Sequence, residues 1–207
     1  MYIPTAFREE TLGPLHEMIQ ATGLAIVASA TAQGVVSTPL PLVLVPEEGP
    51  YGTLYGHMAR ANPHWRETLL GDGTALFLGP SAYISPSWYP SKQEHHRVAP
   101  TWNYVAVEAR GPLEFFDEAG RLRQLLSRLT ARHEAGLPRP WAVEDAPEDY
   151  LAEMLKGIVG LRLPIAHLDG KWKMSQNRTP PDRAGAAAGL QAQGTPAAAA
   201  VASLIPE

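Results

Sequence analysis

The order of strand-like and helix-like segments is the feature that most restricts the fold of this 207-residue chain. Four or five segments with an extended pattern precede the first large helical block, and they do not alternate one-for-one with helices. A doubly wound parallel sheet requires that alternation. About six antiparallel strands with inserted helices therefore predict an α+β fold of the β-barrel type, because barrel closure removes exposed edge strands.

The expected elements follow from apolar spacing and from prolines and glycines. Pro39 and Pro41 interrupt the second strand and predict an edge position or a bulge there. Asn62 followed by Pro63 predicts a helix start directly after the third strand. Strands are expected at 24–30, 35–45, 53–57, 74–78, 103–116 and 161–168, and helices over 12–22, 62–69, 122–129 and 150–158.

Composition restricts the function more than it identifies it. The net charge is -4 with a pI near 6.0, so there is no overall basic footprint for nucleic acid. The absence of cysteine excludes disulfides, thiolate metal sites and cysteine nucleophiles. No basic start followed by an apolar run occurs, nor a stretch of about 18 apolar residues. The chain is therefore expected to be cytoplasmic and not to enter a membrane.

One large domain with a small appendage is expected from the composition along the chain. Residues 1–183 predict a single domain with inserted helices, and residues 184–207 predict an alanine-rich tail. Thr195 and Pro196 can begin a short helix within that tail, so the tail need not be disordered.

A long loop rich in proline and aromatic residues is predicted between residues 83 and 104. Its aromatic content argues against disorder and favours an ordered wall of a site. Trp102 and its neighbours could line a groove for a planar ligand, with Asn103 fixing the ligand's orientation. The alternative is that the aromatic side chains, which are Trp88, Tyr89, Trp102 and Tyr104, only anchor the loop to the core.

Two polar stretches are candidates for anion binding. Arg60 precedes the Asn62-capped helix start, and a guanidinium beside free backbone N–H groups suits a phosphate or carboxylate. Residues 171–178 gather three cations with hydroxyl and amide donors around Trp172. The alternatives are an arginine that only borders a strand and a helix, and a solvated turn anchored by the tryptophan.

Several catalytic classes lack their sequence signals. His95 and His96 are adjacent, and His133-Glu134 lacks the second histidine of a zinc-protease helix, so no metal site is predicted. Nucleophile-elbow, Walker and dinucleotide glycine motifs are also missing. Bound-cofactor chemistry or ligand binding is therefore favoured over catalysis by side chains, and no catalytic residue is assigned.

Blocks along nearly the whole chain resemble the PaiB-like family of FMN-binding negative transcriptional regulators. The blocks occur in the family's order, and several are long and rich in tryptophan. Two departures are His95-His96-Arg97 within the aromatic loop and the alanine-rich stretch Ala184–Ala188. The blocks are residues 1–4 (MYIP), 39–42 (PLPL), 56–63 (GHMARANP), 83–89 (YISPSWY), 100–104 (PTWNY) and 171–178 (KWKMSQNR).

The resemblance implies a split β-barrel of the pyridoxamine-phosphate-oxidase kind with peripheral helices, which forms a homodimer and binds FMN at the subunit interface. Carried over motif by motif, Arg60 and the Asn62-capped helix become candidates for the FMN phosphate, and Trp102-Asn103 for the isoalloxazine ring. A second donor group from 173–178 could reach across the dimer. The expected cofactor-binding residues are His57, Arg60, Asn62, Trp102, Asn103, Lys173, Ser175, Gln176 and Arg178.

The resemblance leaves three functions open. Related proteins are described as repressors of sporulation and protease genes, although direct DNA binding has little support in an acidic chain without a recognition helix or basic arm. A flavin-dependent oxidoreductase acting on a small molecule is the second possibility. A dimeric scaffold without flavin is the third.

Overall fold

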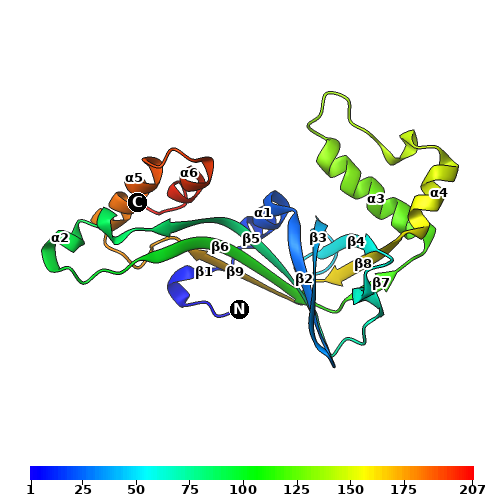
Figure 1. The fold of residues 1–207 in the computed structure, drawn as a ribbon, viewed down its shortest axis with the longest axis horizontal. Helices are drawn as coiled ribbons and strands as arrows, with labels where there is room; N and C mark the ends of the chain where they lie inside the picture. The colour runs from blue at the N-terminus through cyan, green and yellow to red at the C-terminus, as the bar shows by residue number, and fades with distance from the viewer. The chain divides into compact units, whose positions relative to one another are not determined.

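The computed structural model describes all 207 residues, which form two compact units. Nine strands are hydrogen-bonded in the order β1-β9-β6-β5-β2-β3-β4-β8-β7 (Figure 1). None of the helices combines the length and the apolar character needed to cross a membrane. Unit 1 comprises Met1–Leu15, Leu78–Val107 and Asp169–Glu207, and unit 2 comprises His16–Phe77 and Glu108–Leu168.

Four elements contribute residues to both units, and the others belong to one. The shared elements are α1 (Leu12–Thr22), β5 (Gly73–Ile84), β6 (Thr101–Gly111) and β9 (His167–Lys173). Unit 1 adds η1 (Thr5–Phe7), β1 (Arg8–Glu9), η3 (Pro86–Trp88), α2 (Ser91–His95), α5 (Pro180–Gln191) and α6 (Pro196–Ala202). Unit 2 adds β2 (Leu24–Thr31), β3 (Gly34–Val45), β4 (Thr53–Ala59), η2 (Pro63–Arg66), β7 (Glu114–Phe116), α3 (Ala119–Glu134), η4 (Val143–Asp145), α4 (Glu148–Lys156) and β8 (Ile158–Pro164).

The core of unit 2 lies where α3 and α4 pack on the sheet. Leu122, Leu125 and Leu129 recur at helical spacing on α3 and are buried against Phe116 of β7. Figure 1 shows α3 and α4 side by side, next to β8. Gly160 of β8 lies under the Phe116 ring, since a Cβ there would come within 2.3 Å of that ring. The helical pair is thus fixed to the sheet by close packing.

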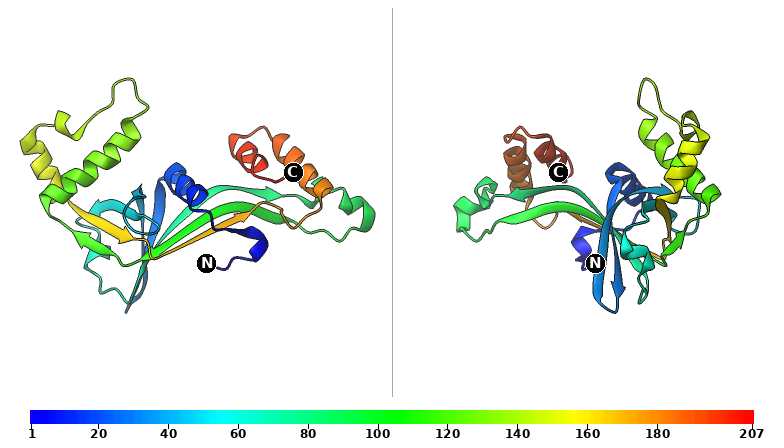
Figure 2. Two further views of the ribbon diagram at one scale, coloured as in Figure 1. Left: turned by 180° about the vertical axis from the view of Figure 1, so that it is seen from behind. Right: turned by 45° about the vertical axis from the view of Figure 1, so that its right-hand side comes forward.

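In unit 1, α5 and α6 pack against each other (Figure 2), and α5 also holds the loop that follows β5. Gly185 and Gly189 of α5 allow Trp88 to approach, because a Cβ at Gly185 would come within 2.1 Å of the Trp88 carbonyl oxygen. The buried carboxylate of Asp182 accepts hydrogen bonds from the Ser91 backbone N–H at 3.1 Å and from the Ser91 hydroxyl at 2.7 Å. The loop that follows β5 is therefore ordered.

Several sequence predictions are confirmed. Gly23 ends α1 in the left-handed conformation, with φ of 67°. Pro39 and Pro41 lie in the part of β3 that pairs with β2, whereas β3 pairs with β4 only from Leu42 onward. Both prolines therefore occupy an edge-like part of the strand, as expected. Thr195 caps α6 through its side chain, which accepts from the Ala198 N–H. The division at residue 183 stays a prediction, and α5 spans that point.

Other predictions were wrong in detail. The strand expected at 74–78 continues to Ile84, and Pro80 is tolerated because the register of β5 with β2 covers only Thr74 to Leu76. The residues after Asn62 form only a 3-10 helix that ends at Arg66. The sheet has nine strands instead of about six, since the strands expected at 103–116 and 161–168 each divide into two and β1 is an additional short strand. The aromatic loop contains η3 and α2.

Candidate functional site

The nine predicted site residues fall into two groups, one in each unit. The group in unit 1 lies on β6, on β9 and in the turn after β9, and the group in unit 2 lies on β4 and in the turn after it. The first contains Trp102, Asn103, Lys173, Ser175, Gln176 and Arg178, and the second contains His57, Arg60 and Asn62.

Lysine side chains of β9 reach the start of β6 and the N-terminal segment. The Lys173 ammonium donates to the Thr101 hydroxyl at 2.5 Å and to the Trp102 carbonyl oxygen at 2.6 Å. Lys171 is buried, donates to the Tyr2 carbonyl oxygen at 3.2 Å and lies 5.1 Å from the centre of the Tyr104 ring. The partners of both ammonium groups are neutral.

A third cation completes a cluster without balancing acids. The Arg178 guanidinium lies 4.9 Å from the centre of the Tyr89 ring, and no carboxylate forms an ion pair with Lys171, Lys173 or Arg178. Burial, followed by the charges of Lys171 and Arg178, holds the pKa of Lys173 below its usual value. We refer to Lys171, Lys173 and Arg178 as the cation cluster. Its charge suits an anionic ligand.

The turn after β9 is fixed by side chains on both sides of Ser175. Ser175 has a left-handed backbone with φ of 63°, and its buried hydroxyl lies 3.1 Å from Asn103 Nδ2 and 3.2 Å from Asn103 Oδ1. Gln176 Oε1 accepts from the Met174 N–H at 2.7 Å, and Gln176 Nε2 donates to the Trp172 carbonyl oxygen at 2.5 Å. Gln176 therefore supports the turn, and its contact with a ligand stays a prediction.

The aromatic side chains of this region divide into an exposed pair and a buried anchor. Tyr83 and Trp102 are 47% and 50% exposed and meet edge to face, with ring centres 6.3 Å apart. Tyr89 is only 2% exposed, and Trp88 packs on the glycines of α5. Trp88 and Tyr89 thus anchor the loop, whereas the Tyr83–Trp102 pair offers surface to a planar molecule.

Arg60 in unit 2 is engaged with the protein itself. Its Nε donates to the Lys156 carbonyl oxygen at 2.8 Å, one terminal nitrogen donates to Asp117 at 3.1 Å and the other to the Ile158 carbonyl oxygen at 3.2 Å. These bonds connect the end of β4 to the junction of α4 and β8. Only the remaining N–H groups of Arg60 could serve an anion. Its role with phosphate stays a prediction.

Asn62 is also occupied, and it leads to a buried histidine that sequence reasoning missed. Asn62 Oδ1 accepts from the His64 N–H at 3.0 Å, and Asn62 Nδ2 donates to the Thr38 hydroxyl at 3.1 Å. His64 is fully buried, with Nδ1 2.9 Å from the Thr38 hydroxyl and Nε2 2.9 Å from the Ser29 hydroxyl. Burial lowers the pKa of His64 and favours the neutral ring. Asn62 therefore holds the short helix to β3, and the contact of this helix start with a phosphate stays a prediction.

His57 is the remaining predicted residue of unit 2. Its Nδ1 is buried and has no hydrogen-bond partner within the protein, and burial lowers the pKa of the imidazole. A neutral ring with an unsatisfied nitrogen can donate to or accept from a ligand.

Comparison with known proteins identifies the family. A family model described as "Putative FMN-binding domain" matches residues 1–167. The chain belongs to this FMN-binding domain family. Protease synthase and sporulation protein PAI 2 of Bacillus subtilis is 30% identical over 206 residues, covering 99% of this chain and 96% of that protein. An uncharacterized protein of Aspergillus fumigatus is 30% identical over 253 residues, covering 100% and 97%. The PaiB-like resemblance is thereby confirmed.

Solved structures of low sequence identity share the fold of this FMN-binding domain. The FAD and haem binding protein from Mycobacterium smegmatis aligns with a TM-score of 0.56 at 17% identity, covering 88% of this chain and 80% of that one. The flavocytochrome Anf3 from Azotobacter vinelandii also gives 0.56, at 15% identity, covering 84% and 71%. The expected α+β split β-barrel with peripheral helices is confirmed.

Proposed function

We propose that this protein is an FMN-binding homodimer with a regulatory role like that implied by the name of its Bacillus subtilis relative. Membership of the FMN-binding domain family supports a flavin. The observation that carries the choice of FMN is the cation cluster beside the exposed Tyr83–Trp102 pair. A phosphate would provide the negative charge that Lys171, Lys173 and Arg178 lack within the protein.

The residues of unit 1 fit the two ends of such a ligand. Lys173 and Arg178 would hold the phosphate, and the Trp102 side chain would border the flat ring. The Ser175–Asn103 pair would supply hydrogen bonds from a turn that is already ordered. For His57, Arg60 and Asn62, which belong to unit 2, contact with the cofactor stays a prediction. A bound flavin supplies electron-transfer chemistry.

A homodimer is supported by an exposed apolar face in unit 2. Leu24 and Ile26 of β2 are 56% and 40% exposed, and their cross-strand neighbours on β3 are the exposed Pro41 and Pro39. Contiguous apolar side chains on a sheet face mark a contact surface. The Ile26→Glu variant is expected to become monomeric in size-exclusion chromatography with light scattering, and an unchanged mass would exclude this face.

Titration of the full chain with FMN, followed by flavin absorbance and fluorescence, tests the cofactor assignment. Wild-type protein should bind FMN at least tenfold more tightly than riboflavin, which lacks the phosphate. Lys173→Ala should weaken FMN binding at least tenfold and leave riboflavin binding almost unchanged. Lys156→Ala is the matched control, since that lysine pairs with Glu153 in unit 2. Absence of FMN binding, or equal FMN affinity in wild type and Lys173→Ala, would refute the assignment.

Regulation by direct DNA contact is the least supported part of the proposal, because the net charge is -4. A mobility-shift experiment with genomic fragments at 50 and 200 mM salt tests it. Specific, salt-sensitive binding would support direct contact, and no shift at either salt concentration would exclude it.

A further inference from the structure

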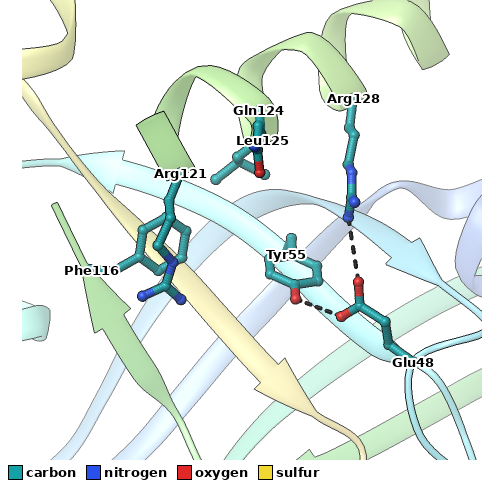
Figure 3. Close-up of a pocket in the computed structure, with 7 residues that line it drawn as sticks. All are labelled: Glu48, Tyr55, Phe116, Arg121, Gln124, Leu125 and Arg128. Atoms are coloured by element: carbon teal, nitrogen blue, oxygen red, sulfur yellow. Dashed lines mark hydrogen bonds and ion pairs between the residues drawn. The ribbon is translucent and has the colours of Figure 1, made fainter. Parts of the chain in front are cut away.

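A second candidate binding site lies in unit 2, apart from every predicted site residue. It is a cavity of about 180 Å³ between α3 and the strands β4 and β7 (Figure 3). At about 30 Å³ for each molecule of liquid water, its volume corresponds to roughly six waters. The space is too small for a nucleotide or a flavin. Its lining residues are Glu48, Tyr55, Phe116, Arg121, Gln124, Leu125 and Arg128.

Polar side chains of α3 form one wall of this cavity. Arg121, Gln124 and Arg128 follow one another at spacings of three and four residues and therefore share a helix face, which Figure 3 shows directed toward the sheet. Gln124 and Arg128 are exposed, so this face borders the cavity from the solvent side. The leucine stripe at 122, 125 and 129 packs in the core nearby. The cavity is thus lined by polar groups, unlike a simple gap in apolar packing.

The sheet side of the cavity is held in place. The Tyr55 hydroxyl donates to Glu48 Oε2 at 2.5 Å and accepts from Arg162 Nε at 3.1 Å. Burial, with a further contribution from Glu48, raises the pKa of Tyr55 and keeps its hydroxyl protonated. Arg121 lies 4.0 Å from the centre of the Phe116 ring and donates to Glu114 at 2.6 Å. These groups already have partners.

Two side chains at the cavity keep N–H groups that the protein itself does not use. One terminal nitrogen of Arg128 forms an ion pair with Glu48 at 3.6 Å, and the guanidinium lies 5.8 Å from the centre of the Tyr55 ring. Its other N–H groups make no hydrogen bond within the protein. The Gln124 amide, one helical turn earlier, makes no hydrogen bond either. Glu48 is the only carboxylate in the lining, and it already accepts from Tyr55. The unused N–H groups at the cavity therefore suit a ligand that accepts hydrogen bonds, above all a planar anion.

We propose that this cavity binds a small organic carboxylate, which accepts hydrogen bonds from Arg128 and Gln124 while its apolar part contacts Leu125. The planar guanidinium matches the two oxygens of a carboxylate. Small size follows from the volume, and the apolar contact from Leu125, which lines the same cavity. The site does not depend on the flavin.

Benzoate and its neutral counterpart benzamide test the proposal by isothermal titration of the full chain, with and without FMN. Benzoate is expected to bind saturably and at least tenfold more tightly than benzamide, whether or not FMN is present. Arg128→Gln should weaken benzoate binding at least tenfold. Arg139→Gln is the matched control, because Arg139 is exposed in the loop after α3 and makes the same change of charge. No saturable benzoate binding, or equal weakening in both variants, would overturn the proposal.

A second variant keeps the test decisive if Arg128→Gln folds poorly. Gln124 is exposed and makes no hydrogen bond, so Gln124→Trp removes no interaction and extends a large side chain over the cavity. The variant should lose benzoate binding and retain the FMN affinity and melting temperature of the wild type. Undiminished benzoate binding in folded Gln124→Trp protein would place the ligand elsewhere and refute the site. Because FMN affinity is measured in the same samples, failure of the flavin assignment is seen separately.

Discussion

The cation cluster of unit 1 and the paired arginines of unit 2 are arranged in opposite ways. In unit 1, Lys171, Lys173 and Arg178 have only neutral partners. In unit 2, Arg121 and Arg162 both pair with Glu114, and Arg60 pairs with Asp117. Like charges held together without acids weaken a fold, whereas matched pairs are at worst neutral near the surface. The difference supports the proposal that the cation cluster holds charge for a ligand, whereas the arginines of unit 2 connect its own elements.

Reversing one charge in the cation cluster should have the largest effect. Lys173→Glu places an acid beside Lys171 and Arg178. The cations of this cluster then have an acidic partner, as the arginines of unit 2 do. FMN affinity should fall at least a hundredfold, about 2.8 kcal/mol, because the carboxylate repels the phosphate. The melting temperature without flavin should change little, because the balancing acid offsets the loss of the two hydrogen bonds that Lys173 donates. A large loss of stability with retained FMN binding would contradict the comparison.

Removing a matched cation from unit 2 should have the converse result. Arg162→Met deprives the Tyr55 hydroxyl of a donor and Glu114 of a partner, so the free energy of unfolding should fall by about 1.5 kcal/mol. FMN affinity should remain that of the wild type. Urea unfolding measures the first effect, with Arg139→Met as the exposed control. A loss no larger than in the control would show that the pairs in unit 2 contribute little.

A change in salt concentration should have a smaller effect on FMN affinity than reversing the charge of Lys173. Raising NaCl from 50 to 500 mM is expected to weaken FMN binding about fivefold, since partly exposed charges are screened. Riboflavin binding should change little, and the salt dependence for FMN should be smaller in Lys173→Ala. The same titrations at three salt concentrations provide the measurement. Equal salt dependence for FMN and riboflavin would show that the phosphate does not cause the salt dependence of FMN binding.

Alkaline pH should produce the smallest effect. Because the folded state lowers the pKa of Lys173 from 10.5, the unfolded chain binds more protons between the lowered pKa and 10.5. The destabilisation by Lys173 is therefore fully present below the lowered pKa and disappears as pH rises toward 10.5. The stability difference between Lys173→Met and wild type should narrow over that range in urea unfolding. A difference that stays constant with pH would show that this lysine is not perturbed.

Much of the fold was accessible from local patterns. The leucine stripe of α3, the glycine stop of α1 and the edge prolines of β3 each act within a few residues, so the sequence alone predicted them. The extension of β5 through Pro80 was not predictable, because it depends on where β2 stops pairing. Strand pairing between distant segments leaves no local signal.

The candidate site was predictable only in part for the same reason. The donors of 171–178 were recognised from composition, but the bond from Lys173 to the Trp102 carbonyl requires that β9 lie beside β6. The free histidine nitrogen at residue 57 and the buried contacts of His64 depend equally on tertiary structure. The polar face of α3 at 121, 124 and 128 has the composition of a solvated face, so nothing in its sequence distinguished it.

The left-handed backbone of Ser175 has a consequence for variation among relatives. Glycine would adopt that conformation without strain, whereas a residue with a Cβ is disfavoured there by about 1 to 2 kcal/mol. Serine at this position is therefore less favourable for the backbone than glycine, but it provides the hydroxyl that hydrogen-bonds with Asn103. Relatives that keep the ligand are expected to keep serine, and relatives that have lost it should drift to glycine. Residue 175 would then mark which members of the family still use the site.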